Sequence, residues 1–138
     1  MTAPHYDDKD WPLFRATVPR TEMDDDEFMA FVTTLDELPL RGGKFAVLLD
    51  VRASPPLSAT RRQLLGERGN ASYARYPGAM TGMAIVMSSA IQRGIFTAIH
   101  WMMRQPQQVK AFASIGEAET WLRARLRESG TRSLVSNE

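Results

Sequence analysis

KFAVLLDVR, residues 44–52, is the stretch that decides the fold of this chain. Its apolar residues run without interruption from position 45 to position 49, so this strand should be buried on both faces. After a polar, arginine-rich segment, MTGMAIVMSS at 80–89 repeats the pattern, and the helical stretch IQRGIFTAIHWMM follows at 91–103. Strand, helix, strand and helix in this order, with buried-type strands, predict a parallel sheet covered by helices.

The residues before this unit predict strands and then a helix. Residues 5–20 favour one or two edge strands, because β-type residues partly alternate there and prolines stand near both ends. Asp24 with Glu27 three residues later matches a capping box, which predicts the start of a helix with one apolar face. Pro39 and the glycines after it end that helix.

The residues after the first central strand predict three further helices. Ser58 can cap a weakly amphipathic helix over about residues 59–75, which we expect to be the most exposed helix, with its arginines facing water. A second central strand at about 80–87 leads into a helix whose apolar stripe begins at Ile91. A short strand near 109–113 precedes the last helix.

This order of elements predicts an α/β fold with a small mixed, mostly parallel sheet of four or five strands and helices. We expect residues 1–128 to form a single domain. Residues 129–138 are small and polar, and we expect them to be a flexible C-terminal tail.

Composition narrows the possible functions. The 138 residues include no cysteine, which excludes a disulfide framework, a thiolate zinc site and a cysteine nucleophile. The first ten residues carry no basic-then-apolar leader, and no apolar run approaches the ~20 residues of a membrane span. We therefore expect a cytoplasmic protein without a membrane span.

Charge is divided unevenly along the chain. Residues 1–40 hold ten acids against three basic residues, a net charge of −7, and residues 41–138 hold fourteen basic residues against six acids, a net charge of +8. One interpretation is a basic face for an acidic partner or a nucleic acid. We favour the alternative, in which an acidic helix packs beside basic ones, and we expect no nucleic-acid partner.

The best polar site candidates follow the first central strand. Asp50 and Arg52 stand at its carboxyl end, where open α/β sheets place binding crevices, and such a pair can either orient a ligand or lock a loop. We favour the loop-locking role. Ser54 and Ser58 lie between this strand and the helix that follows it. A phosphate on a serine is stabilised near a helix N-terminus, so either serine is a candidate phosphorylation site, although ordinary helix capping also explains the presence of Ser58.

Residues for an enzymatic reaction are not grouped in this sequence. His100 lies on an apolar helix, and with His5 in the terminus it does not make a metal site. The chain lacks a G-x-S-x-G elbow, a phosphate-binding glycine loop and a dinucleotide fingerprint. We therefore predict a non-enzymatic protein without a cofactor or a metal.

The sequence from about residue 11 to residue 126 resembles the SpoIIAA-like group of the STAS superfamily, the fold of bacterial anti-sigma-factor antagonists. The residues that carry the resemblance form four groups along the chain. They are Asp50 and Arg52 in D-x-R; Arg61 and Arg62 in the next helix; Ala84, Ile85 and Val86 followed by Arg93, Gly94, His100 and Trp101; and Phe112, Glu117, Ala118, Trp121 and Leu122.

The resemblance implies a regulatory or adaptor module that binds a partner protein, sometimes switched by serine phosphorylation at the start of the second helix. We place that surface on the carboxyl-end loops and on Arg61, Arg62 and Arg68. In the antagonists the phosphorylated serine stands in a D-x-S stretch, whereas this chain has DVRASPPLS, so Ser54 and Ser58 are near the motif but outside it. A homodimer is possible.

The alternative function is a carrier or sensor of a small apolar or anionic ligand, which Sec14-like use of the same fold implies. Methionines are frequent in the second central strand and the following helix, and methionine adapts well to apolar ligands. They are Met80, Met83, Met87, Met102 and Met103.

Overall fold

A five-stranded sheet in the order β1-β2-β3-β4-β5 forms the centre of the computed structural model, which describes residues 3–93 and 108–136. The strands are β1 His5–Asp7, β2 Leu13–Thr17, β3 Phe45–Asp50, β4 Met80–Val86 and β5 Val109–Phe112. β1 runs antiparallel to β2, and the three other neighbouring pairs are parallel. The prediction of a mixed, mostly parallel sheet of four or five strands is confirmed.

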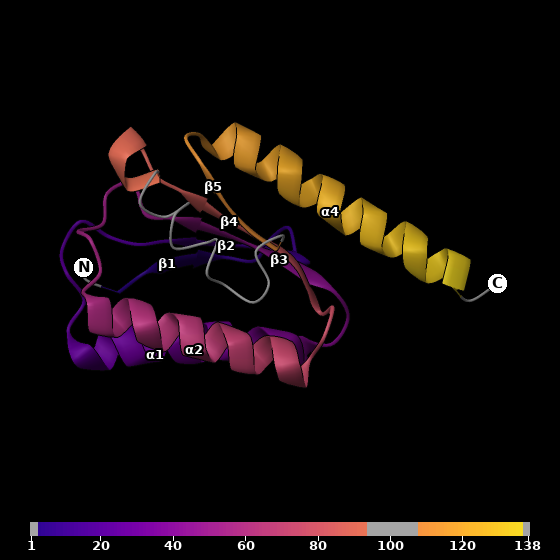
Figure 1. Ribbon diagram of the computed structural model, residues 1–138, viewed down its shortest axis with the longest axis horizontal. Coiled ribbons are helices and arrows are strands. Elements are labelled where there is room, and N and C mark those ends of the chain that lie inside the picture. Colours follow the sequence, from indigo (N-terminus) through magenta and orange to yellow (C-terminus); the bar gives the residue numbers. More distant parts are fainter. Residues whose placement is uncertain (1–2, 94–107, 137–138) are drawn as a thin grey trace.

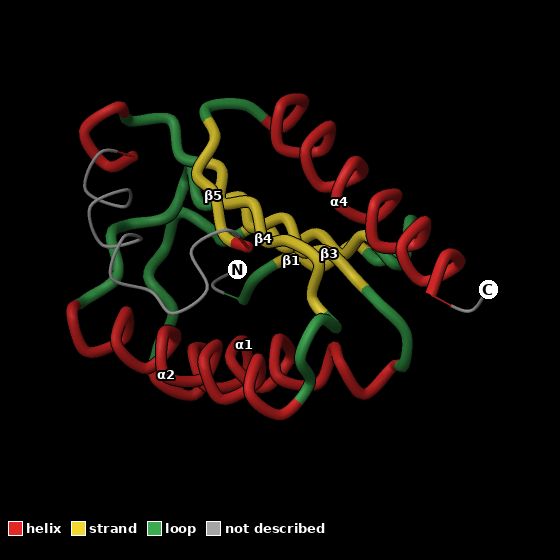
Figure 2. Tube along the Cα trace, turned by 45° about the vertical axis from the view of Figure 1, so that its right-hand side comes forward, coloured by secondary structure: helices red, strands yellow, loops and turns green. Residues whose placement is uncertain are grey.

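Helices cover both faces of this sheet. α1 Asp25–Glu37 and α2 Ala59–Arg75 lie on one face, and α4 Ile115–Ser136 lies on the other, as both Figure 1 and Figure 2 show. A short 3-10 helix, η1 Leu38–Arg41, continues α1, and residues 90–93 begin a helix after β4. The rest of the helix predicted after β4, including His100, lies outside the described residues.

The predicted helix starts are present. Asp24 accepts a hydrogen bond from the Glu27 backbone N–H at 2.8 Å, and the Glu27 carboxylate accepts one from the Asp24 N–H at 3.0 Å, so the capping box is complete. Ser58 caps α2 by accepting from the Arg61 N–H at 3.2 Å. The helices α1, α2 and α4 and the helix that begins at residue 90 each follow a parallel strand, and therefore begin at the carboxyl edge of the sheet.

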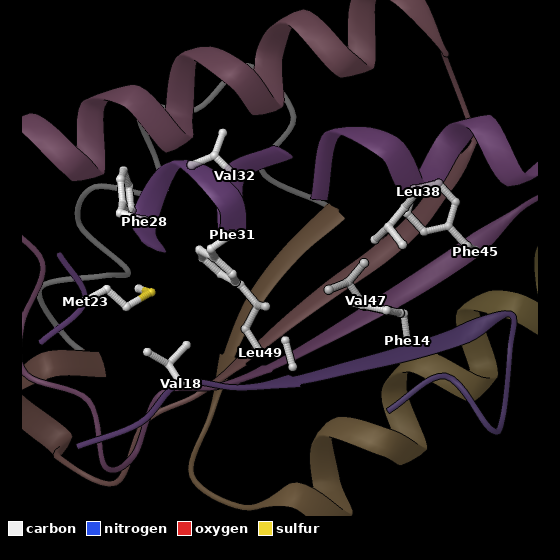
Figure 3. Close-up of a cluster of buried hydrophobic side chains, with 11 residues drawn as sticks. Phe14, Val18, Met23, Phe28, Phe31, Val32, Leu38, Phe45, Val47 and Leu49 are labelled. Carbon is white, nitrogen blue, oxygen red and sulfur yellow. The ribbon is translucent and has the colours of Figure 1, made fainter. Parts of the chain in front are cut away.

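β3 is buried along its whole length and separates two apolar clusters. Its alternate residues Val47 and Leu49 face α1, where they pack with Phe28 and Phe31 (Figure 3). The intervening side chains pack beneath α4, in a second cluster. Its buried members are Leu13, Ala46, Leu48, Ala84, Val86, Phe112, Ala118 and Leu122. This two-sided burial is the physical reason for the unbroken apolar run in the sequence.

The two ends of the fold differ in part from the sequence expectations. β1 is an edge strand as predicted, but β2 is not, because it pairs with β1 on one side and with β3 on the other. At the other end, the backbone of α4 stays helical past Glu128 to Ser136. The single domain and the flexibility of residues 129–138 stay predictions.

Candidate binding surface at the carboxyl edge

Asp50, the last residue of β3, is bound by Arg52 two residues later. The Arg52 side chain donates from Nε to Asp50 Oδ1 at 2.9 Å and from Nη2 to Oδ2 at 2.8 Å, and the Arg52 backbone N–H adds a bond of 3.2 Å. Asp50 is buried, with 8% exposure, whereas the Arg52 side chain is 44% exposed. The pair closes the loop after β3 and leaves one side of the guanidinium open to solvent.

The electrostatics of this pair favour its charged form. Burial alone raises the pKa of Asp50, but the hydrogen bonds and the charge of Arg52 outweigh burial, so the pKa of Asp50 lies below its usual value. The hydrogen bond and charge of Asp50 in turn raise the pKa of Arg52. Neither group is poised to exchange a proton near neutral pH, which fits positioning better than acid–base chemistry.

The two candidate serines already have local hydrogen bonds. The half-buried Ser54 donates its hydroxyl to the Pro55 carbonyl at 2.8 Å, while its backbone N–H closes a turn onto Val51 at 3.1 Å. Ser58 is exposed and caps α2. Ser58 is therefore the more accessible hydroxyl of the two, and phosphorylation of either residue stays a prediction.

The arginines of α2 differ from one another in their surroundings. The Arg61 side chain is only 15% exposed, so the expectation that the arginines of α2 face water is wrong for this residue. Its guanidinium donates to the Met23 carbonyl at 2.9 Å and to Asp25 at 3.0 Å. Arg62 is exposed, and its guanidinium donates to the carbonyl of Leu57, in the loop just before α2, at 3.1 Å. Arg68 faces Asp36 of α1 at 3.5 Å.

The start of the helix after β4 contributes two residues that were not singled out as site residues. Ile91 is 76% exposed, although the spacing of apolar residues places it on the apolar stripe of its helix. The reason is position, because Ile91 lies in the first turn, at the rim of the sheet. Arg93 donates to the Met87 carbonyl at 2.7 Å; in the sequence it is marked only by its place in the R-G pair that carries the family resemblance.

The carboxyl edge therefore presents Arg52, Arg62 and Ile91 to solvent, on the loops and helix starts that follow β3 and β4. Exposed cations and an exposed apolar side chain along one edge can contact another macromolecule. Within residues 3–93 and 108–136, no three histidine, aspartate or glutamate side chains are grouped as a metal site would need. No helix in the same described part is long and apolar enough to cross a membrane.

Residues 16–123 match the family model described as SpoIIAA-like, so the chain belongs to the SpoIIAA-like family. One solved structure with this fold is that of an uncharacterized protein from Shewanella loihica PV-4. It matches with a TM-score of 0.54 at 16% identity, over 87% of this chain and 92% of its own. Among curated proteins, none matches the chain.

The match confirms the resemblance to the SpoIIAA-like group and the α/β fold that the sequence predicted. SpoIIAA-like proteins are generally non-enzymatic, and their domains typically interact with other proteins. Membership in this family is consistent with a regulatory domain.

Proposed function

We propose that this protein is a non-enzymatic regulatory or adaptor module of the cytoplasm that binds a partner protein at the carboxyl edge of its sheet. One observation carries the proposal: the exposed cations Arg52 and Arg62 share this edge with the exposed Ile91. Arginine is one of the residues that most often contribute binding energy at protein interfaces, and it favours an acidic partner surface. An exposed apolar side chain such as Ile91 gains free energy when a partner removes it from water.

The residues of this surface divide into supporting and contacting groups. Arg61 and Asp50 support it, because their side chains are engaged within the fold. Arg62 is the best single contact residue, since it is exposed and the hydrogen bond described for its guanidinium goes to the Leu57 carbonyl, in the loop just before α2. Arg68 stands further along α2, and its exposed guanidinium can extend the contact.

The test compares two exposed arginines on opposite faces of the sheet. Arg62→Glu reverses a charge at the proposed surface, and Arg127→Glu makes the same change on α4. Each variant is expressed with a tag in the source organism, and the recovered proteins are quantified by mass spectrometry. We expect at least one protein to be captured by wild type and Arg127→Glu but lost with Arg62→Glu, with the direct contact then measured by calorimetry on purified components.

An identical set of captured proteins with all three baits would contradict this surface. Loss of the same protein with both variants would show a general charge effect and would also contradict it. Arg61→Glu is a poor choice for this test, because losing the contacts of Arg61 with the buried Met23 and Phe28 would disturb α2 itself.

The carrier function is tested separately. In the described part of the chain, Met80 and Met83 are partly buried and pack against the first core cluster, so core packing already accounts for these two. Native mass spectrometry of the protein purified without refolding would support a carrier if a non-covalent adduct disappeared on denaturation. A covalent phosphate in the same spectrum would support a switch at Ser54 or Ser58, and a doubled mass would support the homodimer.

A further inference from the structure

Helix α2 is attached to the molecule differently from α1 and α4. None of its seventeen residues, all of which the structure describes, is buried. In contrast, α1 buries Phe28, Phe31 and Val32, and α4 buries Ala118 and Leu122. Since burial of apolar surface is the main source of helix stability in proteins, α2 lacks the contribution that holds α1 and α4 in place.

Among the contacts of α2 with the described residues, the firmest is made by the Arg61 side chain, which reaches across to the start of α1. Its Nη1 donates to the Met23 carbonyl at 2.9 Å, and its guanidinium carbon lies 4.7 Å from the centre of the Phe28 ring. The third partner, Asp25, is 98% exposed, so that ion pair contributes little. Met23 and Phe28 are both buried, so the contacts of Arg61 with these two residues contribute most to holding α2 against α1.

The other contacts of α2 within residues 3–93 and 108–136 are weaker. Leu64 and Leu65 pack against the first core cluster but stay only partly buried. The ion pair between Arg68 and Asp36 spans 3.5 Å, between an exposed arginine and a partly exposed aspartate. Gly66 and Gly69 lower the helix propensity of the segment further.

We propose that α2 opens as a separate unit while the sheet, α1 and α4 stay folded, and that the Arg61 side chain is the clamp that holds it closed. Elements with few buried apolar contacts open at a lower free energy than the core around them. Opening would uncover the Phe28 ring and the side of the core cluster beneath Leu64 and Leu65. The proposal concerns the helix that carries Arg62, but it does not depend on the proposed partner protein.

Native-state hydrogen exchange of the purified full-length protein tests the separate opening. We expect the interior amides of α2 to exchange about a hundredfold faster than those of β3, with a smaller dependence on urea, because less surface is exposed in a local opening. Equal exchange free energies and equal urea dependence for α2 and β3 would overturn the proposal, since α2 would then open only in global unfolding.

Two variants separate the clamp from general destabilisation. Arg61→Met keeps an apolar stem but removes the guanidinium, and should speed exchange in α2 about tenfold. Gly82→Ala perturbs the α4 side of the sheet, which stays folded when α2 opens. It should therefore speed exchange in β3 about fivefold while changing α2 less than twofold. Equal acceleration of α2 by both variants would show that α2 unfolds only with the whole domain.

The matched control for the clamp is Arg62→Met, which removes a neighbouring but exposed guanidinium. It should change exchange in α2 less than twofold. If exchange in α2 is equally fast in Arg61→Met and Arg62→Met, the proposed role of Arg61 is wrong. If the β3 amides of the Arg61→Met variant lose their protection completely, Arg61 stabilises the whole domain and not α2 alone. Because all measurements use the isolated protein, a negative result leaves the proposed partner surface untouched.

Discussion

Gly82 of β4 lies directly against the Trp121 side chain of α4. A Cβ atom added to Gly82 would lie 3.2 Å from Cζ3 and 3.3 Å from Cη2 of Trp121, and 3.4 Å from a methyl carbon of Leu122. The absence of a side chain at this position therefore sets how closely α4 approaches the sheet. Leu122 is fully buried and Trp121 is packed against Phe112, so neither neighbour can move freely.

This contact predicts that Gly82→Ala destabilises the protein by about 1 kcal/mol through overpacking, despite the better strand propensity of alanine. The midpoint of urea unfolding, followed by tryptophan fluorescence, measures the change. Gly66→Ala in α2 is the matched control, because nothing lies within 4 Å of its added Cβ, and it should stabilise by about 0.4–1 kcal/mol. The same sign for both substitutions would contradict the close approach of α4.

The pair formed by Asp50 and Arg52 predicts a pH-dependent contribution to stability. Because the pKa of Asp50 is lowered in the folded state, its contribution is present above the unfolded value of about 3.9 and is lost as pH falls through the folded pKa. At pH 7, Asp50→Asn should cost about 1–3 kcal/mol, since charged hydrogen bonds to Arg52 are removed.

Urea unfolding of wild type and Asp50→Asn between pH 7 and pH 3 checks this. The difference between the two proteins should be constant from pH 7 to about pH 5 and shrink below about pH 4. Arg52→Met should behave similarly, because it removes the other half of the pair. A difference that stayed constant down to pH 3 would mean that the Asp50 carboxylate is not the stabilising species.

Arg15 links β2 to α4, and we expect this link to make a second electrostatic contribution to the free energy of unfolding. Its Nε donates to Glu119 at 2.9 Å and its Nη1 to Asp10 at 2.6 Å. Burial lowers the pKa of Arg15, but the bonds to the two carboxylates outweigh burial and raise it. In a double-mutant cycle of Arg15→Met with Glu119→Gln, we expect a coupling free energy of about 0.5–1 kcal/mol, which falls in 1 M salt because the pair is partly exposed. Additive effects of the two substitutions would rule the link out.

Local signals were sufficient for most of the elements. The apolar run of β3, the capping box at Asp24 and the hydroxyl cap at Ser58 involve residues within a few positions of each other, and all three are present in the structure. The close pairing of Asp50 with Arg52 is local in the same sense. Such features are set by backbone hydrogen bonding and side-chain reach over one turn or one strand.

Features that depend on distant parts of the chain could not be predicted in the same way. The partial burial of the Arg61 side chain requires the start of α1 as a neighbour, and the interior place of β2 requires the pairing with β3. The periodicity of one segment specifies which face is apolar but not which other element covers it. For the same reason Ile91 has an apolar pattern and yet lies exposed at the rim of the candidate site.

The capping box of α1 gives a last prediction, because it isolates a single local interaction. Asp24→Ala removes the acceptor for the Glu27 N–H and should cost about 1 kcal/mol. Asp26→Ala is the control: it removes an acid from the same first turn, where the helix dipole contributes only about 0.3–1 kcal/mol, and leaves the cap intact. Thermal unfolding of both variants, with exchange of the first α1 amides, measures the difference. Equal losses would mean that only charge near the helix start matters, whereas a larger loss for Asp24→Ala assigns the stability to the hydrogen bond itself.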